Sequence, residues 1–81
     1  MRAKVYVTLK SGVLDPQGKA VQGAIRSLGH AEVLDVRQGK YFEIRLTDSM
    51  SRERAGALLD ELAKTVLSNG VIENYRVELE G

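Results

Sequence analysis

The segment GVLDPQG, residues 12–18, is the first pattern in the chain that could do chemistry. Gly12 and Gly18 bracket an Asp-Pro pair directly before a helical pattern, which is where a phosphate-binding loop would lie. The segment lacks the Lys-Ser/Thr ending of a P-loop and the full glycine spacing of a dinucleotide fingerprint. Asp15 followed by Pro16 is also typical of a helix start, because the carboxylate accepts hydrogen bonds from the first N–H groups and proline needs no donor there. We predict that Asp15 caps a helix beginning at Pro16, with a phosphate loop as the minor alternative.

Three further patterns could support catalysis, and each has a plainer structural interpretation. His30 is the single histidine and has no nucleophile near it in sequence, so we expect a partly exposed turn or cap residue. Asp60 and Glu61 are adjacent, and adjacent helical residues do not face each other, so a solvated helix face is expected. Residues 21–26, VQGAIR, faintly resemble the acylphosphatase phosphate loop but fall inside the predicted helix. The chain has no cysteine, and we predict no catalytic, cofactor-binding or metal-binding residue on it.

Tyr6 and Tyr41 are candidates for a binding surface. Both occupy outward positions on predicted strands, as base-stacking aromatic residues do in RNA recognition modules. However, Glu43 occupies the neighbouring outward position, and 12 Lys and Arg against 11 Asp and Glu give a formal net charge of only +1. Nucleic-acid binding usually requires a basic face, so no nucleic-acid partner is expected. We interpret the two tyrosines as a protein interface that helps the chain to self-associate.

The elements that must position these residues follow from the hydrophobic period. Alternation of apolar and polar residues predicts strands over residues 4–10, 31–37, 41–46 and 71–81, with residues 38–40 as a hairpin connection. Helical spacing predicts helices over residues 16–28 and from about residue 55 to 66, the second ending near Ser68-Asn69-Gly70. No linker or low-complexity segment interrupts the pattern, so residues 1–81 are expected to form one domain.

The order β-α-β-β-α-β predicts an α+β fold, the ferredoxin-like plait, in which a four-stranded antiparallel sheet carries both helices on one face. The first and third strands would be central neighbours, and the other face would be open. Small-molecule-binding ACT domains share this plait and bind amino acids near a Gly-rich first turn, so an ACT-like regulatory module is the alternative function. No apolar stretch approaches the length of a membrane span, and a cytoplasmic protein without a membrane partner is expected.

Three segments resemble the PurS subunit family of phosphoribosylformylglycinamidine synthase, in the same order and over essentially the whole chain. The most specific is KSGVLDPQG, residues 10–18, which leads from the first strand into the first helix. The second is VRQGK, residues 36–40. The third is NGVIENY, residues 69–75, where the family usually reads NPVIEDY. Gly70 and Asn74 therefore depart from the family's proline and aspartate, which makes this loop less rigid and less acidic.

The resemblance implies an accessory subunit that is not itself catalytic. The family's enzyme converts formylglycinamide ribonucleotide, glutamine and ATP to formylglycinamidine ribonucleotide, glutamate, ADP and phosphate in de novo purine biosynthesis. The resemblance implies that the PurL subunit holds ATP and Mg, that the PurQ glutaminase releases ammonia, and that PurS helps the two assemble for ammonia transfer. We add Gln17, Arg37 and Lys40 to the two tyrosines as candidate contacts with these partners or with a second copy. A homodimer or higher homo-oligomer is expected, because so small a domain has a limited core.

Overall fold

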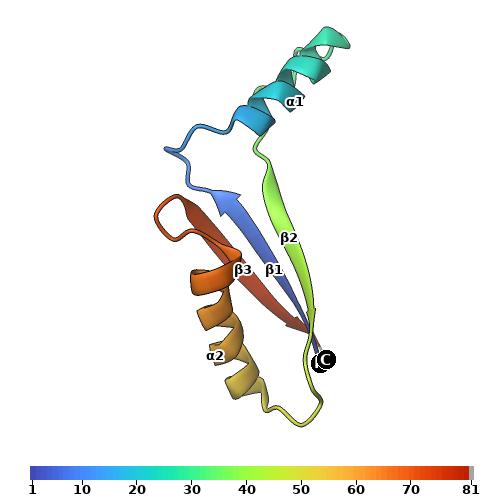
Figure 1. Ribbon diagram of the computed structural model, residues 1–81. Coiled ribbons are helices and arrows are strands. Elements are labelled where there is room, and N and C mark those ends of the chain that lie inside the picture. Colours follow the sequence, from blue (N-terminus) through green and yellow to red (C-terminus); the bar gives the residue numbers. More distant parts are fainter. Residues whose placement is uncertain (81) are drawn as a thin grey trace.

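The computed structural model describes residues 1–80 and forms an α+β fold around one antiparallel sheet. The elements are β1 (Arg2–Leu9), α1 (Pro16–Ser27), β2 (Gly39–Arg45), α2 (Arg52–Leu62), the π-helical turn η1 (Ala63–Leu67) and β3 (Glu73–Glu80). The sheet has three strands in the order β2-β1-β3, and α2 lies along it (Figure 1). The predicted first, third and last strands and both helices are therefore confirmed.

The core lies between the central strand β1 and α2. Ala3, Val5 and Val7 alternate along β1 and are at most 1% exposed, because β2 and β3 flank this strand and α2 covers this face. The register pairs Val5 with Phe42 on β2 and with Val77 on β3. The predicted neighbours Tyr6 and Tyr41 are also paired directly, on the opposite face of the sheet.

Helix α2 presents small and apolar residues to the sheet at four-residue intervals. Ala55 and Leu59 of α2 and Ala63 at the start of η1 have no exposed surface, as expected for one stripe of an amphipathic helical segment. The helix begins at Ser51, whose side chain accepts a hydrogen bond from the Arg54 N–H. The turn η1, which follows α2 directly, ends where the backbone N–H and the hydroxyl of Ser68 both donate to the Ala63 carbonyl, at 3.0 and 2.6 Å. None of the helices between residues 1 and 80 is long and apolar enough to cross a membrane.

The predicted strand over residues 31–37 does not form, so the four-stranded sheet is wrong for this chain. The segment runs back along α1, and its polar groups bond to side chains of the α1 region instead of to a ladder. The Gln22 side chain donates to the Leu34 carbonyl at 3.0 Å, and Asp15 accepts the N–H of the following Gln38. The hairpin at residues 38–40 is also absent, because Gly39 begins β2 and pairs with Thr8.

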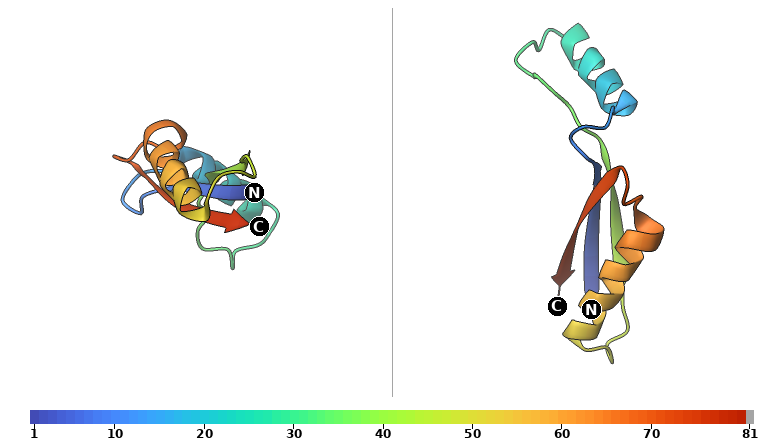
Figure 2. Two further views of the ribbon diagram at one scale, coloured as in Figure 1. Left: turned by 90° about the horizontal axis from the view of Figure 1, so that it is seen from below. Right: turned by 90° about the vertical axis from the view of Figure 1, so that its left-hand side faces the viewer.

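The prediction that both helices cover one face of the sheet is wrong for α1. Helix α1 and the returning segment extend beyond the end of the sheet, and only α2 lies over it (Figures 1 and 2). Gly18 is the single buried residue of α1. The radius of gyration is 16.2 Å, whereas a compact domain of 81 residues would have about 12 Å. The single chain is therefore elongated and lacks the second helical layer of a plait.

Candidate functional site

The Asp15 carboxylate joins the start of α1 to the segment before β2. One oxygen, Oδ1, accepts the Gly18 N–H at 2.9 Å, as the sequence predicted for a helix cap. The other, Oδ2, accepts the Gln38 N–H at 2.7 Å, from 23 residues further along the chain. Asp15 is only 4% exposed, and the Gln38 and Gly18 amides lower the pKa of its carboxyl group below the ordinary value of 3.8. The carboxylate thus caps a helix and closes a long loop at once.

Arg37 and Gln17 strengthen the same junction. The Arg37 guanidinium donates from Nη2 to the carbonyls of Lys10 and Val13, at 3.0 and 2.9 Å. The Gln38 side chain donates to Gln17 Oε1 at 2.8 Å. We call the group formed by Asp15, Gln17, Gly18, Arg37 and Gln38 the clasp.

The clasp joins two of the sequence motifs. GVLDPQG ends at residue 18 and VRQGK begins at residue 36, yet their side chains bond across the junction between α1 and β2. A β-carbon at Gly18 would lie 2.3 Å from the Val36 carbonyl oxygen, so this close approach requires glycine. Asp15 places a negative charge at the N-terminus of α1 and binds the Gly18 amide that a phosphate would need. This geometry does not favour the phosphate-loop alternative.

Tyr6 and Tyr41 form a stacked group on the open face of the sheet, the face opposite α2. Their ring centroids are 5.1 Å apart with a 36° angle between planes, and the Arg76 guanidinium carbon lies 4.3 Å from the Tyr6 ring centroid. The Tyr41 hydroxyl donates to Glu43 at 3.1 Å. The pKa of the Tyr41 phenol is raised, first by desolvation and then by Glu43. Tyr6 is half-buried under its neighbours, whereas Tyr41 is 48% exposed and available for a contact.

Lys40 lies apart from both groups. Its ammonium group is 3.3 Å from the Leu67 carbonyl oxygen and 3.4 Å from a carboxylate oxygen of Glu73, so it joins the start of β2 to the end of η1 and the start of β3. The five candidate interface residues therefore occupy three places: Gln17 and Arg37 in the clasp, Tyr6 and Tyr41 on the open face, and Lys40 beside η1. The structure does not bring them together in one site.

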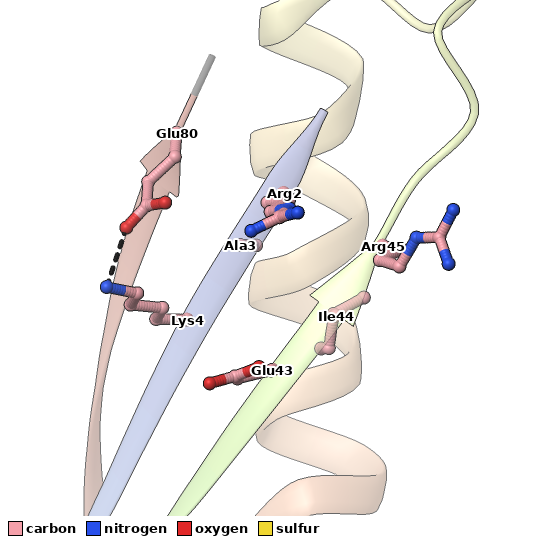
Figure 3. A pocket seen from close by; sticks show the side chains of 7 residues that line it. All are labelled: Arg2, Ala3, Lys4, Glu43, Ile44, Arg45 and Glu80. Atoms are coloured by element: carbon pink, nitrogen blue, oxygen red, sulfur yellow. Dashed lines mark ion pairs between the residues drawn. The ribbon is translucent and has the colours of Figure 1, made fainter.

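A shallow hollow of about 330 Å³ lies at the end of the sheet near both termini (Figure 3). Arg2 on β1 is paired with Arg45 on β2 in the strand register, and Lys4 Nζ lies 2.8 Å from Glu80 on β3. This bond raises the pKa of Lys4 and lowers that of Glu80. Three cationic and two acidic side chains contribute to the lining, which consists of Arg2, Ala3, Lys4, Glu43, Ile44, Arg45 and Glu80. Its chemistry is that of an ion-paired protein surface, with no nucleophile beside a base.

The residues considered for catalysis occupy ordinary surface positions. His30 is exposed, with Nδ1 3.5 Å from Glu32 in the turn after α1. Asp60 accepts a hydrogen bond from the Tyr75 hydroxyl and lies 3.3 Å from Lys64, and both bonds lower the pKa of its carboxyl group. Among residues 1–80, no three His, Cys, Asp or Glu side chains are grouped closely enough to hold a metal ion.

Sequence reasoning missed two participants. The sequence predicts Gln38 as part of a hairpin connection. In the structure its backbone N–H donates the second hydrogen bond to the Asp15 carboxylate, and nothing in the local sequence indicates this long-range bond. Arg76 covers Tyr6 from β3. The alternation along the last strand could have revealed Arg76, because it occupies an outward position directly opposite Tyr6 in the register.

A comparison with protein families matches residues 2–81 to the PurS model, described as phosphoribosylformylglycinamidine (FGAM) synthase. The chain belongs to the PurS family. The FGAM synthase subunit PurS of Bacillus subtilis is 51% identical to it over 79 residues, covering 98% of this chain and 92% of the relative. The Methanocaldococcus jannaschii PurS is 33% identical over 79 residues, covering 98% and 94%.

Solved structures of PurS proteins are similar in fold to this chain. The B. subtilis PurS crystal structure matches with a TM-score of 0.87 at 48% identity, over 99% of this chain and 98% of the other. A chain from the structure of PurLQS from Thermotoga maritima matches with a TM-score of 0.84 at 25% identity, over 95% and 93%. The three-stranded sheet with a protruding α1 is therefore compatible with the PurS fold over nearly its full length.

Proposed function

We propose that this PurS-family chain is the subunit that assembles FGAM synthase. In this role it holds the PurL synthetase and the PurQ glutaminase together, so that ammonia released from glutamine reaches the ATP-dependent conversion of formylglycinamide ribonucleotide to formylglycinamidine ribonucleotide. The full-length family match carries the proposal, and the similarity to a chain of the T. maritima PurLQS structure supports it. An ACT-like regulatory module is not favoured by these matches.

The chemistry is divided so that this chain binds proteins and the other subunits bind substrates. ATP and Mg belong to PurL in this proposal, and no cofactor is assigned to this chain. The two acidic side chains considered for chemistry already have partners within the chain. Asp15 is bonded to two backbone N–H groups, and Asp60 is bonded to Tyr75 and Lys64. Both therefore stabilise the fold, which supports a binding role for the chain. We place the assembled enzyme in the cytoplasm.

The open face is the surface that we assign to protein contacts, either with the other subunits or with a second copy of the chain. Tyr41 is exposed beside a guanidinium–aromatic stack, and aromatic and arginine side chains are the types that contribute most at protein interfaces. Arginine, lysine and glutamate side chains surround the stack and can provide the polar rim of such an interface.

Self-association is the second part of the proposal. The chain exposes 5849 Å², whereas a compact monomer of 8.9 kDa would expose about 4,800 Å². The excess of roughly 1,000 Å² is similar to the ~800 Å² that each partner contributes to a standard protein interface. A second copy of the chain could cover this area.

Reconstitution with PurL and PurQ tests the assembly role. We expect glutamine-dependent FGAM formation to require this chain, while activity with added ammonia remains without it. Tyr41→Ala should weaken assembly, whereas Thr8→Ala, an exposed position on the same face, should not. Equal glutamine-dependent activity with and without the chain would contradict the proposal. An amino acid that raises the melting temperature of the isolated chain would instead support the ACT-like alternative.

A further inference from the structure

The loop between η1 and β3 contains an Asn-Gly pair, Asn69-Gly70, at the end of the sheet from which α1 extends (Figure 1). Both residues are exposed, and a β-carbon at Gly70 would meet no atom within 4 Å. Asparagine is one of the chemically labile side chains, because a neighbouring nucleophile can attack its amide carbon. The loop therefore exposes an electrophilic carbon, Asn69 Cγ, next to a backbone nitrogen that no side chain shields.

The hydrogen bonds of this loop hold the Asn69 side chain over the following peptide group. Asn69 Oδ1 accepts the Val71 N–H at 3.0 Å, an Asx turn in which the side chain folds back past the Gly70 nitrogen. The Asn69 N–H donates to a carboxylate oxygen of Glu73 at 2.7 Å, which fixes the residue from its other side. The described residues, 1–80, provide no hydrogen-bond acceptor for the Gly70 N–H. The amide carbon and the nitrogen are thus positioned for reaction within one turn.

We propose that Asn69 converts without an enzyme to aspartate and isoaspartate, through a cyclic imide that it forms with Gly70. The Gly70 nitrogen loses its proton to solvent base, and its electron pair forms a bond to Asn69 Cγ. The Cγ–Nδ2 bond breaks, and Nδ2 leaves with a proton as ammonia. Negative charge develops on Oδ1 during the attack, where the Val71 N–H already donates and stabilises it.

Water completes the reaction by opening the imide ring on either side of the Gly70 nitrogen. Cleavage of the bond to Cγ gives aspartate, and cleavage of the bond to the main-chain carbonyl carbon gives isoaspartate. The sum is the exchange of an amide for a carboxylate, with one water consumed and one ammonia released. No reagent other than water and solvent base is needed.

Other amide side chains of the chain serve as internal comparisons. Asn74 is the other asparagine, but it lies inside the paired strand β3 and precedes the bulky Tyr75. The chain also has three Gln-Gly pairs, at residues 17–18, 22–23 and 38–39. Glutamine would have to form a larger ring, with one more rotatable bond to fix, so its attack is slower. We therefore expect the conversion at Asn69 to be the fastest in the chain.

The conversion changes the place where β3 begins. The Asn69 carbonyl accepts the Ile72 and Glu73 N–H groups at 3.1 and 2.7 Å, and the Ile72 carbonyl accepts the Lys10 N–H at 2.8 Å. Isoaspartate inserts a methylene group into the main chain and turns the residue 69 carbonyl into a free carboxylate, so this turn loses its geometry. Either product also places a new negative charge near the Glu73 carboxylate, and like charges repel. The converted chain should therefore be less stable.

Peptide mass spectrometry of the full chain, incubated at neutral to mildly alkaline pH, tests the site. The tryptic peptide of residues 65–76 contains both asparagines, so its fragments compare them within one molecule. We expect conversion at Asn69 to be several-fold faster than at Asn74 and to accelerate with pH, because the Gly70 nitrogen must lose a proton. Gly70→Pro has no N–H and should abolish it. Gly70→Ala, for which the loop has space, should slow it several-fold.

Three outcomes would overturn the inference. The first is equal conversion of Asn69 and Asn74, and the second is an unchanged rate in Gly70→Pro and Gly70→Ala. The third is conversion only in urea, because the Asx turn requires the folded chain to react at least as fast as the unfolded one. These measurements do not involve PurL or PurQ, so their failure would leave the proposed assembly role intact.

The stability of the products tests the structural consequence. Converted chains can be separated by their added negative charge, and we expect them to melt at a lower temperature than unconverted chains. Asn69→Asp is the matched control, because it adds the charge but keeps the normal main chain. It should lower the melting temperature by less than the isoaspartate product does. Equal melting temperatures for all three proteins would show that the turn before β3 does not depend on Asn69.

Discussion

At the scale of single residues, Asp15 joins two segments of the chain through one buried side chain. Its carboxylate accepts two backbone N–H groups from segments far apart in sequence, while a simple helix cap such as Ser51 accepts one from its own helix. Hydrogen bonds to a charged acceptor are stronger than neutral ones, and a buried donor left without a partner is costly. Loss of Asp15 should therefore affect both the helix and the junction to β2.

We predict that Asp15→Asn lowers stability at neutral pH by more than Ser51→Ala does, for which a cap loss of about 1 kcal/mol is expected. The pKa of the Asp15 carboxyl group is lowered in the folded protein, so its contribution is present above pH 3.8 and is lost as the pH falls through the folded pKa. Urea unfolding of both variants and the wild type between neutral and acidic pH measures this. The Asp15→Asn deficit should shrink on acidification, while the Ser51→Ala deficit should not; a deficit independent of pH would contradict the prediction.

Two glycines of α1 provide a second residue-scale prediction. A β-carbon at Gly18 would meet the Val36 carbonyl oxygen at 2.3 Å, whereas a β-carbon at Gly23 would have no atom within 4 Å. We expect Gly18→Ala to destabilise the fold by about 1–3 kcal/mol through overpacking. Gly23→Ala should stabilise it by about 0.5–1 kcal/mol, because alanine loses less conformational freedom in a helix. Denaturant midpoints of the two variants check this, and equal shifts would show that the clasp does not constrain Gly18.

At the scale of elements, Tyr75 links β3 to α2. Its hydroxyl donates to Asp60, which also pairs with Lys64 one turn later in the helical segment. The bond to Asp60 is the main reason that the pKa of the Tyr75 phenol is raised above 10.0. A raised pKa contributes stability that is complete below pH 10.0 and is lost as the pH rises through the folded value.

We predict that Tyr75→Phe lowers the melting temperature near neutral pH and reduces the further loss of stability at alkaline pH. Tyr41→Phe is the control, because the Tyr41 hydroxyl bonds to Glu43 on its own strand and does not join two elements. Melting curves from neutral to strongly alkaline pH measure both effects. A larger fall for Tyr41→Phe than for Tyr75→Phe would show that the α2–β3 contact does not depend on this bond.

At the scale of the whole molecule, the single chain has an extended shape with principal extents of 51 × 26 × 15 Å. Much apolar surface is therefore still exposed, including Leu14, Leu28, Leu34, Val66 and Val71, each at least 71% exposed. If a second copy covers part of this surface, folding and association are linked by mass action.

We predict that the melting temperature rises with protein concentration. The reason is that an associated folded state is favoured over unfolded monomers as the concentration increases. Calorimetry over a wide range of concentrations measures the shift, and Leu28→Glu should reduce it. A wild-type melting temperature that is independent of concentration would indicate that the elongated chain is stable as a monomer.

The sequence by itself determined the helices, three of the strands and the family. These features depend on local patterns: the alternation in β1, the helical spacing of Ala55, Leu59 and Ala63, and the Asp15-Pro16 helix start. The pairing of Tyr6 with Tyr41 was also predictable, because their outward positions and the strand order follow from the same patterns.

Only the tertiary structure decided where α1 lies and whether residues 31–37 form a strand. A local pattern can show that Val33 and Val36 are partly buried. It cannot show whether they pack against a neighbouring strand or against α1 of the same chain. The long-range bonds from Asp15 to Gln38 and from Arg37 to Lys10 and Val13 hold α1 and residues 31–37 beyond the end of the sheet. Such bonds depend on residues more than 20 positions apart meeting in space, which short-range periodicity does not encode.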